Sequence, residues 1–139
     1  MTFLLDTDQV SLDQRGHLLV RSRIQVAGPE QAVLSVITVE EQMRGWLATI
    51  HAASTPDART TAYQRLRMTV EYFASFTIID DTAQVDALVS DLRKQGIRIG
   101  TQDLRIAAMA LVHGATLVTR NHVDFQRVPG LAIEDWSVR

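Results

Sequence analysis

Three acidic residues stand beside apolar segments at widely separated places in the chain. Asp6 follows Phe3-Leu4-Leu5, and Glu41 falls in the first turn of a predicted helix. Asp103 directly precedes a nearly uninterrupted apolar run. A carboxylate beside apolar residues is costly unless it is paired or coordinated, so these acids are candidates to meet around a cation. Mg²⁺ or Mn²⁺ is favoured over zinc, because the chain has no Cys and only four His.

A fourth polar group is expected from the segment 121–124. Asn121 follows the predicted strand 116–119, and Asp124 lies three residues further on. We expect Asp124 to be the charged member, because Asn cannot balance the charge of a divalent ion. Asn121 would then supply an oxygen or an orienting hydrogen bond. The alternative for Asp124 is a surface acid paired with Arg127.

Each of the three acids also has an ordinary structural interpretation. Glu41 is the third residue after Thr38, which is the spacing of a capping box. Asp103 would complement a helix dipole, and Asp6 would be a turn residue. Taken singly, each structural interpretation is the stronger one. The metal-site prediction rests on the set, because the predicted fold brings all three acids to one edge.

Short apolar strands alternate with helices along the chain. The predicted strands are 3–5, 32–36, 77–79, 116–119 and 131–133. The first predicted helix follows Thr7 or Asp8, and the second covers 17–26. The third runs from Thr38 through Ile50, and the fourth covers 58–76. The fifth runs from Asp80 or Asp81 through Leu92, and the sixth from a Thr101 cap through Leu111. This alternation predicts an α/β sandwich with a mainly parallel sheet. Ligands of such sheets bind beyond the carboxyl ends of the strands, at a topological switch point.

Composition limits the class of protein. The 139 residues are 46% hydrophobic and 22% charged, which predicts one globular domain over residues 1–139. The absence of Cys and of a secretion signal predicts a cytoplasmic protein. No apolar run approaches the ~20 residues of a membrane span. A net charge of -2 gives no global attraction to nucleic acid, so any such contact needs a local basic patch.

Five segments in order carry a family resemblance that covers nearly the whole chain. They are 3–8, 35–41 with Gly45, 100–108, 117–121 and 125–131. Together they resemble the PIN-domain ribonucleases, specifically the VapC-type toxins. The resemblance implies a three-layer sandwich with a central, mainly parallel sheet of four to five short strands flanked by helices. It also implies an endoribonuclease that depends on Mg²⁺ or Mn²⁺, a homodimer, and a cognate antitoxin protein.

The family's acidic residues can be carried over one by one. The first, second and third fall on Asp6, Glu41 and Asp103. The family's usual Asp-Thr-Asn opening reads Asp6-Thr7-Asp8 here, and an often acidic position is occupied by Asn121. Asp124 matches an acidic position found in some members.

The implied chemistry is metal-assisted hydrolysis of an RNA phosphodiester. The expected catalytic residues are Asp6, Glu41, Asp103 and Asp124, and the expected metal ligands among them are Asp6, Asp103 and Asp124. Residues expected to orient carboxylates or water are Thr7, Thr119 and Asn121. Capping or strand-end packing is the alternative for the two threonines.

Several basic residues are candidates to contact RNA. Arg120 comes first, because it adjoins Asn121 in the sequence and a guanidinium binds phosphate bidentately. The others are Arg127, Arg15, Arg21, Arg23 and His122. The alternative is that these arginines are solvated or form surface ion pairs.

Apolar residues at helical spacing predict either core or a partner surface. They are Met43, Trp46 and Leu47 on one helix, and Tyr63, Leu66, Val70 and Phe73 on the next. Core is the ordinary interpretation, and an antitoxin groove or a dimer face is the functional one. A second function hypothesis is a catalytically silent PIN-like module that binds protein or RNA. A third is a structure-specific DNA nuclease, which would need additional DNA-clamping elements.

Overall fold

A computed structural model describes residues 1–139 and contains one five-stranded sheet. The strands are β1 (Phe3–Leu5), β2 (Ala32–Ser35), β3 (Ile78–Ile79), β4 (Thr116–Val118) and β5 (Ile133–Glu134). Their order is β3-β2-β1-β4-β5, and every neighbouring pair is parallel. The predicted α/β class and parallel sheet are therefore confirmed. The last strand lies two residues later than its predicted start.

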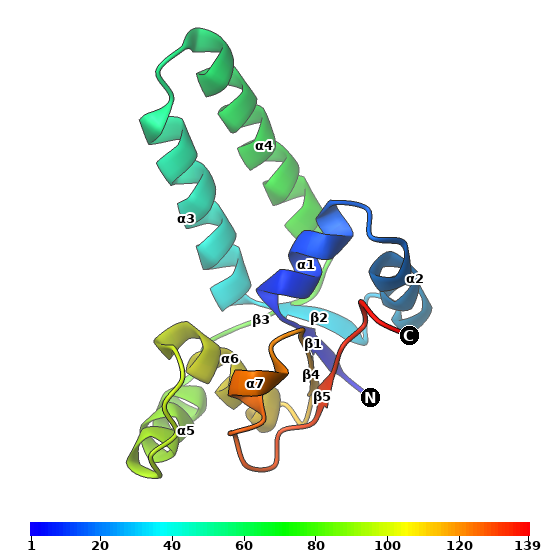
Figure 1. Ribbon diagram of the computed structural model, residues 1–139, viewed down its shortest axis with the longest axis vertical. Coiled ribbons are helices and arrows are strands. Elements are labelled where there is room, and N and C mark those ends of the chain that lie inside the picture. Colours follow the sequence, from blue (N-terminus) through cyan, green and yellow to red (C-terminus); the bar gives the residue numbers. More distant parts are fainter.

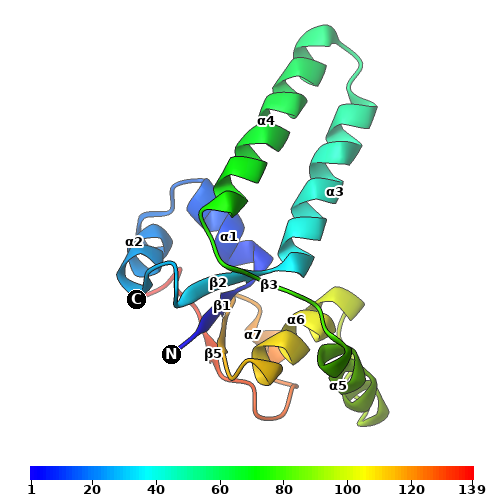
Figure 2. The ribbon, with the colours of Figure 1, turned by 180° about the vertical axis from the view of Figure 1, so that it is seen from behind.

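The chain also forms seven helices. They are α1 (Thr7–Gln14), α2 (Leu18–Ala27), α3 (Val36–Ala52), α4 (Pro56–Ala74), α5 (Ala83–Lys94), α6 (Thr101–Val112) and α7 (His122–Phe125). The helices α1 and α2 lie on one side of the molecule and α5 and α6 on the other, whereas α3 and α4 form a hairpin that extends away from the sheet (Figure 1, Figure 2). None of the helices combines the length and the apolar character that crossing a membrane requires.

The alternation of side chains along each strand builds two apolar cores. Leu4 and Leu117 point to the core formed with α5 and α6, whereas Leu5 and Val118 point to the core formed with α1, α2 and the end of α4. Successive residues of a strand face opposite sides of a sheet, so short strands of consecutive apolar residues supply both cores. This arrangement confirms the predicted three layers.

The start of α3 differs from the prediction. The helix begins at Val36, and the hydroxyl of Ser35 accepts a hydrogen bond from the Thr38 backbone N–H at 3.2 Å. Ser35 is both the last residue of β2 and the helix cap, because the strand passes into the helix without an intervening loop. Thr38 is therefore inside the helix, and the capping-box interpretation of Glu41 is wrong.

Two further helix caps also differ from the prediction. Asp6, rather than Thr7 or Asp8, caps α1, and its Oδ1 accepts from the Thr7 N–H at 2.9 Å. The cap of α6 is Gly100, which has no side chain to bond, so the prediction of a Thr101 cap is wrong. The Thr101 hydroxyl instead accepts from Arg93 at 3.2 Å.

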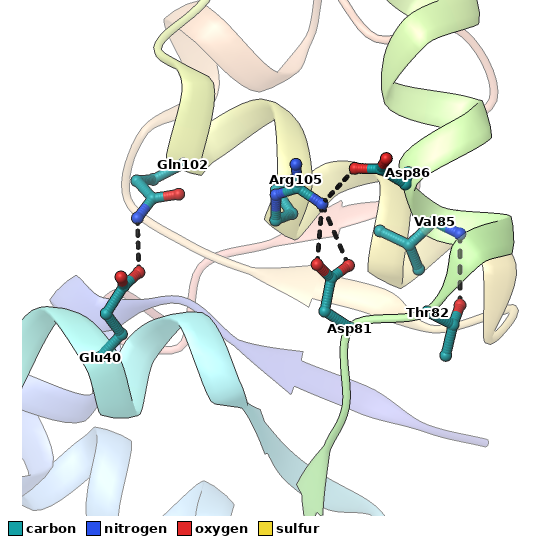
Figure 3. Close-up of polar contacts among 7 residues, drawn as sticks. All are labelled: Glu40, Asp81, Thr82, Val85, Asp86, Gln102 and Arg105. Atoms are coloured by element: carbon teal, nitrogen blue, oxygen red, sulfur yellow. Dashed lines mark hydrogen bonds and ion pairs between the residues drawn. The ribbon is translucent and has the colours of Figure 1, made fainter.

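The cap of α5 is Thr82, not Asp80 or Asp81. The Thr82 hydroxyl accepts from the Val85 N–H at 3.2 Å (Figure 3). Asp81 instead accepts two hydrogen bonds from Arg105 of α6, at 2.9 and 3.1 Å, and Arg105 also pairs with Asp86 of α5 at 2.9 Å. Arg105 thus holds α6 against α5 and the segment that precedes it.

The core interpretation of the α3–α4 residues is wrong for part of the set. Leu47, Tyr63 and Val70 are 57%, 56% and 52% exposed, and only Phe73 of the seven named residues is fully buried. Helical spacing shows which residues share a face, but it does not show whether the chain itself covers that face. The hairpin extends away from the sheet (Figure 1), and the exposed fractions show that the chain leaves part of its apolar face uncovered.

Candidate active site

Asp6 lies at the carboxyl end of β1, next to the carboxyl end of β4. Its side chain is buried, and its Oδ2 accepts from the Thr119 hydroxyl at 2.8 Å while its Oδ1 caps α1. The sheet order places the connections of β1 and β4 on opposite sides, so this is the topological switch point. Burial, followed by the charge of Asp8, raises the pKa of Asp6 to about 7.

A chain of hydroxyl groups connects Glu41 to this strand end. The Thr7 hydroxyl donates to Glu41 Oε2 at 2.8 Å and lies 3.0 Å from the Thr38 hydroxyl. Because the single proton of Thr7 goes to Glu41, Thr38 must donate to Thr7. The carboxylate is therefore oriented from two helices, α1 and α3. Burial raises the pKa of Glu41, and the charge of Asp103 adds to this effect.

Asp103 comes from the first turn of α6, which a polar contact fixes against α3. Gln102 donates to Glu40 Oε1 at 2.7 Å, and each of these residues directly precedes a predicted catalytic acid (Figure 3). The Asp103 side chain has no hydrogen-bond or ion-pair partner in the structure. Burial raises the pKa of Asp103, with further contributions from the charges of Asp124 and Asp8.

Asp124 lies on α7, a short helix that the sequence analysis did not predict. Asn121 caps this helix, and its side-chain amide donates to Asp124 Oδ2 at 3.0 Å. The Arg127 guanidinium lies 4.0 Å from Asp124 Oδ1, and both side chains are well exposed. The amide of Asn121 thus orients Asp124, as expected if Asp124 is a metal ligand. The ion pair with Arg127, expected if Asp124 is an ordinary surface acid, is also present but at the longest distance that counts as an ion pair.

Asp8 is an acidic residue beside Asp6 that the sequence analysis treated as a possible helix cap and as a departure from the family pattern, and not as a site residue. Its Oδ2 accepts from the Arg120 backbone N–H at 3.0 Å and lies 3.5 Å from the Thr119 hydroxyl. Its Oδ1 is buried and has no hydrogen-bond partner. Burial raises the pKa of Asp8. Its position two residues after Asp6, at the same strand end, is the signal that could have identified it.

The acids present fit a hard divalent cation by their chemistry. Asp6, Asp8, Glu41 and Asp103 supply carboxylate oxygens, and none of the four forms an ion pair with Lys, Arg or His. No three His, Asp or Glu side chains are arranged so that they could hold a metal ion as they stand. Like-charged carboxylates repel one another, so side-chain rotation toward a shared ion is the expected response to binding.

The predicted RNA-contacting arginines are dispersed. Arg120 is exposed beside Asp8, and Arg127 adjoins Asp124. Arg15 is at the opposite end of α1 from Asp6, where it lines a groove against α3 and α4. Arg21 pairs with Asp13, and Arg23 donates to the Asp135 carbonyl. Only Arg120 and Arg127 are therefore next to the acids.

Comparison with known proteins assigns the family. The PIN domain model matches residues 3–131. Ribonuclease VapC1 of Rickettsia felis is 44% identical over 69 residues, 46% of this chain and 52% of that relative, so the match spans about half of its length. Ribonuclease VapC2 of Haemophilus influenzae is 30% identical over 143 residues, covering 98% of both proteins. The solved structure of VapBC-1 from nontypeable Haemophilus influenzae has a TM-score of 0.74 at 26% identity and covers 99% of this chain and 100% of that one. The chain therefore belongs to the PIN-domain family, among its VapC members.

Proposed function

We propose that this protein is a divalent-metal-dependent endoribonuclease and the toxin component of a toxin-antitoxin pair. The observation that carries the proposal is the group of buried or half-buried carboxylates at the switch point, led by Asp6, Glu41 and Asp103, without a cationic partner. Relatives that match this chain are named ribonucleases. A protein that keeps such unpaired acids gains from a cation that neutralises them.

The residues would divide the work as follows. Asp6, Asp103 and Asp124 would hold Mg²⁺ or Mn²⁺, which when bound acts as a Lewis acid and lowers the pKa of water. Thr119 keeps Asp6 oriented, and the Asn121 amide does the same for Asp124.

Glu41 has a different place in this scheme. Thr7 binds only its Oε2, which leaves Oε1 available to accept a proton from an attacking water. Its raised pKa suits a proton acceptor near neutral pH better than an ordinary glutamate would.

The proposed partner is a cognate antitoxin, as in the related VapBC complex. A groove of about 620 Å³ lies between α1 and the α3–α4 hairpin, and its lining includes Arg15, Arg65, Trp46 and Met68. Basic, aromatic and thioether groups together suit an acidic or aromatic-rich peptide. The exposed Leu47, Tyr63 and Val70 are candidates for the proposed homodimer face. A reducing, cytoplasmic site of action stays a prediction from the absence of Cys.

The test is sequencing of RNA ends after brief expression of the protein without an antitoxin. The wild-type chain is expected to create discrete new RNA ends, and Asp103→Asn is expected to create none. The same new ends with both proteins would contradict the assignment of the active site.

The catalytically silent binding module is the second candidate function, and the lack of a ready-made metal cage favours it. It predicts RNA or antitoxin binding without any new RNA ends. The same sequencing experiment, paired with a binding measurement, separates the two functions.

A further inference from the structure

A cavity of about 670 Å³ adjoins the candidate active site on the side of α5 and α7. Its polar lining includes Arg93 at the end of α5, Arg98 in the loop before α6, and Asp124. Gly100, three residues before Asp103, also lines it. The cavity therefore shares one wall with the acids and continues away from them along the loop 97–100.

The two arginines of this cavity carry charge that the protein does not neutralise. Neither Arg93 nor Arg98 belongs to any ion pair of the structure. Arg93 only donates to the Thr101 hydroxyl, a neutral group, at 3.2 Å. Arg105 on the neighbouring helix shows the contrast, since it pairs with Asp81 and Asp86. The cavity is thus lined by two arginines whose guanidinium groups are free of ion pairs and available for an anion.

The loop that carries Arg98 is fixed in place. Ile97 and Ile99 pack against the apolar core on either side of it, while Arg98 itself is exposed. The Arg127 guanidinium, from beyond α7, donates to the Arg98 carbonyl at 3.1 Å. An arginine on a fixed backbone has less chain freedom to lose when it binds a ligand than one on a flexible loop does.

We propose that Arg93 and Arg98 form a phosphate-binding subsite for the RNA strand, at a nucleotide next to the one whose phosphodiester is cleaved. The inference rests on the proposed nuclease function. It adds that the RNA strand runs from the acids into this cavity. Guanidinium groups bind phosphate oxygens bidentately and hold an RNA backbone without reading its sequence. Asp124 connects the two regions, since it lines the cavity and is one of the proposed metal ligands.

The experiment measures RNA binding in the absence of cleavage. The full-length Asp6→Asn protein, in buffer with a chelator, is titrated with a labelled single-stranded RNA of mixed sequence at several salt concentrations. Adding Arg93→Gln or Arg98→Gln is expected to raise the Kd about 10-fold each. Each substitution is also expected to reduce the slope of log K against log salt by about 0.7, the value for one phosphate contact on a single strand.

Lys94→Gln is the matched control. It removes the same charge one residue from Arg93, but Lys94 does not line the cavity. Its Kd is expected to stay within about 2-fold of the parent, as for a change in the general field of the protein. Thermal melting of all variants excludes unfolding as the cause. Arg93→Lys with Arg98→Lys is expected to restore the salt slope but only part of the affinity, because lysine keeps the charge without the bidentate geometry.

Three results would overturn the inference. In the first, Arg93→Gln and Arg98→Gln weaken RNA binding no more than Lys94→Gln does. In the second, both variants bind RNA like the parent but lose affinity for the cognate antitoxin, which would assign the cavity to that protein. In the third, wild-type protein neither binds nor cuts RNA, and the proposed function then fails together with the inference. Discrete RNA ends from the wild-type chain distinguish the first two results from the third.

Discussion

Single hydroxyl groups organise the candidate site at the scale of the residue. Thr119 orients Asp6, whose second oxygen caps α1, and Thr7 orients Glu41, whose Oε1 stays without a hydrogen-bond partner. Thr119 is the first residue after β4 and is buried, so its hydroxyl must find a partner, whereas Thr7 is the first residue of α1 and is half-buried. The sequence predicted both as orienting residues, and the hydrogen bonds support that role.

Glu41 and Glu40 offer a direct comparison between neighbouring glutamates. Glu41→Gln is expected to lower kcat/KM for RNA cleavage about 100-fold or more, because an amide neither accepts a proton nor balances a metal charge. Glu40→Gln keeps an oxygen that can accept from Gln102 and is expected to change kcat/KM by less than about 3-fold. Equal losses in the two variants, with both proteins folded, would contradict a catalytic role for Glu41.

The raised pKa of Asp6 predicts a pH dependence for the metal-free protein. The folded value of about 7 lies above the ordinary 3.8, so the folded chain binds more protons than the unfolded chain between these pH values. The contribution of Asp6 to the free energy of unfolding is therefore complete below about pH 4 and is lost as the pH rises to about 7. Asp6→Asn removes this titration while keeping a good helix cap.

Urea unfolding in the presence of a chelator measures this effect. The variant is expected to gain stability relative to the wild-type protein as the pH rises from about 5 to about 8. A difference between the two proteins that stays constant over this range would show that Asp6 is already ionised at about pH 5.

At the residue scale the sequence singled out candidate acids but not all of the residues around them. Asp6, Glu41 and Asp103 could be predicted because charged groups beside apolar segments are conspicuous in any parallel α/β pattern. Asp8, Arg93 and Arg98 were not assigned to a site. Their roles depend on which atoms are left unpaired by the packing of β4, α5 and α6, and a sequence does not contain that information.

At the scale of the element, strands and helices could be predicted far better than their exact starts. All five strands and six of the seven helices were expected, because each has an apolar pattern of its own. The caps of α1, α3, α5 and α6 were misassigned, because several polar residues stand at each boundary and the strand-to-helix path selects among them. The core interpretation was wrong for part of the α3–α4 hairpin, because an apolar helix face has the same residue spacing whether the chain buries it or leaves it exposed.

The reassigned cap of α3 gives a prediction at this scale. Ser35→Ala is expected to lower the free energy of unfolding by about 1–2 kcal/mol, since it leaves the buried Thr38 N–H without its partner. Thr101→Ala, at the position that the sequence pattern favoured as a cap, is expected to cost less than about 0.5 kcal/mol. Chemical denaturation of both variants measures the difference. A larger loss of stability for Thr101→Ala than for Ser35→Ala would favour Thr101 as the cap of α6.

At the scale of the whole molecule, the candidate metal ligands come from separate parts of the fold. Asp6 follows β1, Asp103 begins α6, and Asp124 lies on α7. Of these elements, α6 is fixed against α3 by the hydrogen bond from Gln102 to Glu40. An ion bound by all three acids would connect parts of the chain that separate on unfolding, so binding must couple to global stability.

Metal addition is therefore expected to raise the melting temperature of the whole protein. With Mg²⁺ or Mn²⁺ at about 100 times its dissociation constant, linkage predicts roughly 2.7 kcal/mol of additional stability, and the gain should saturate with concentration. Asp103→Asn removes one acid of the site and also relieves its repulsion with Asp124, so this variant is expected to be more stable than wild type without metal and to gain little from it. Calorimetry of both proteins with and without the ion makes the comparison. An equal gain in both would place the ion elsewhere, because a site that includes Asp103 cannot bind equally well after its charge is removed.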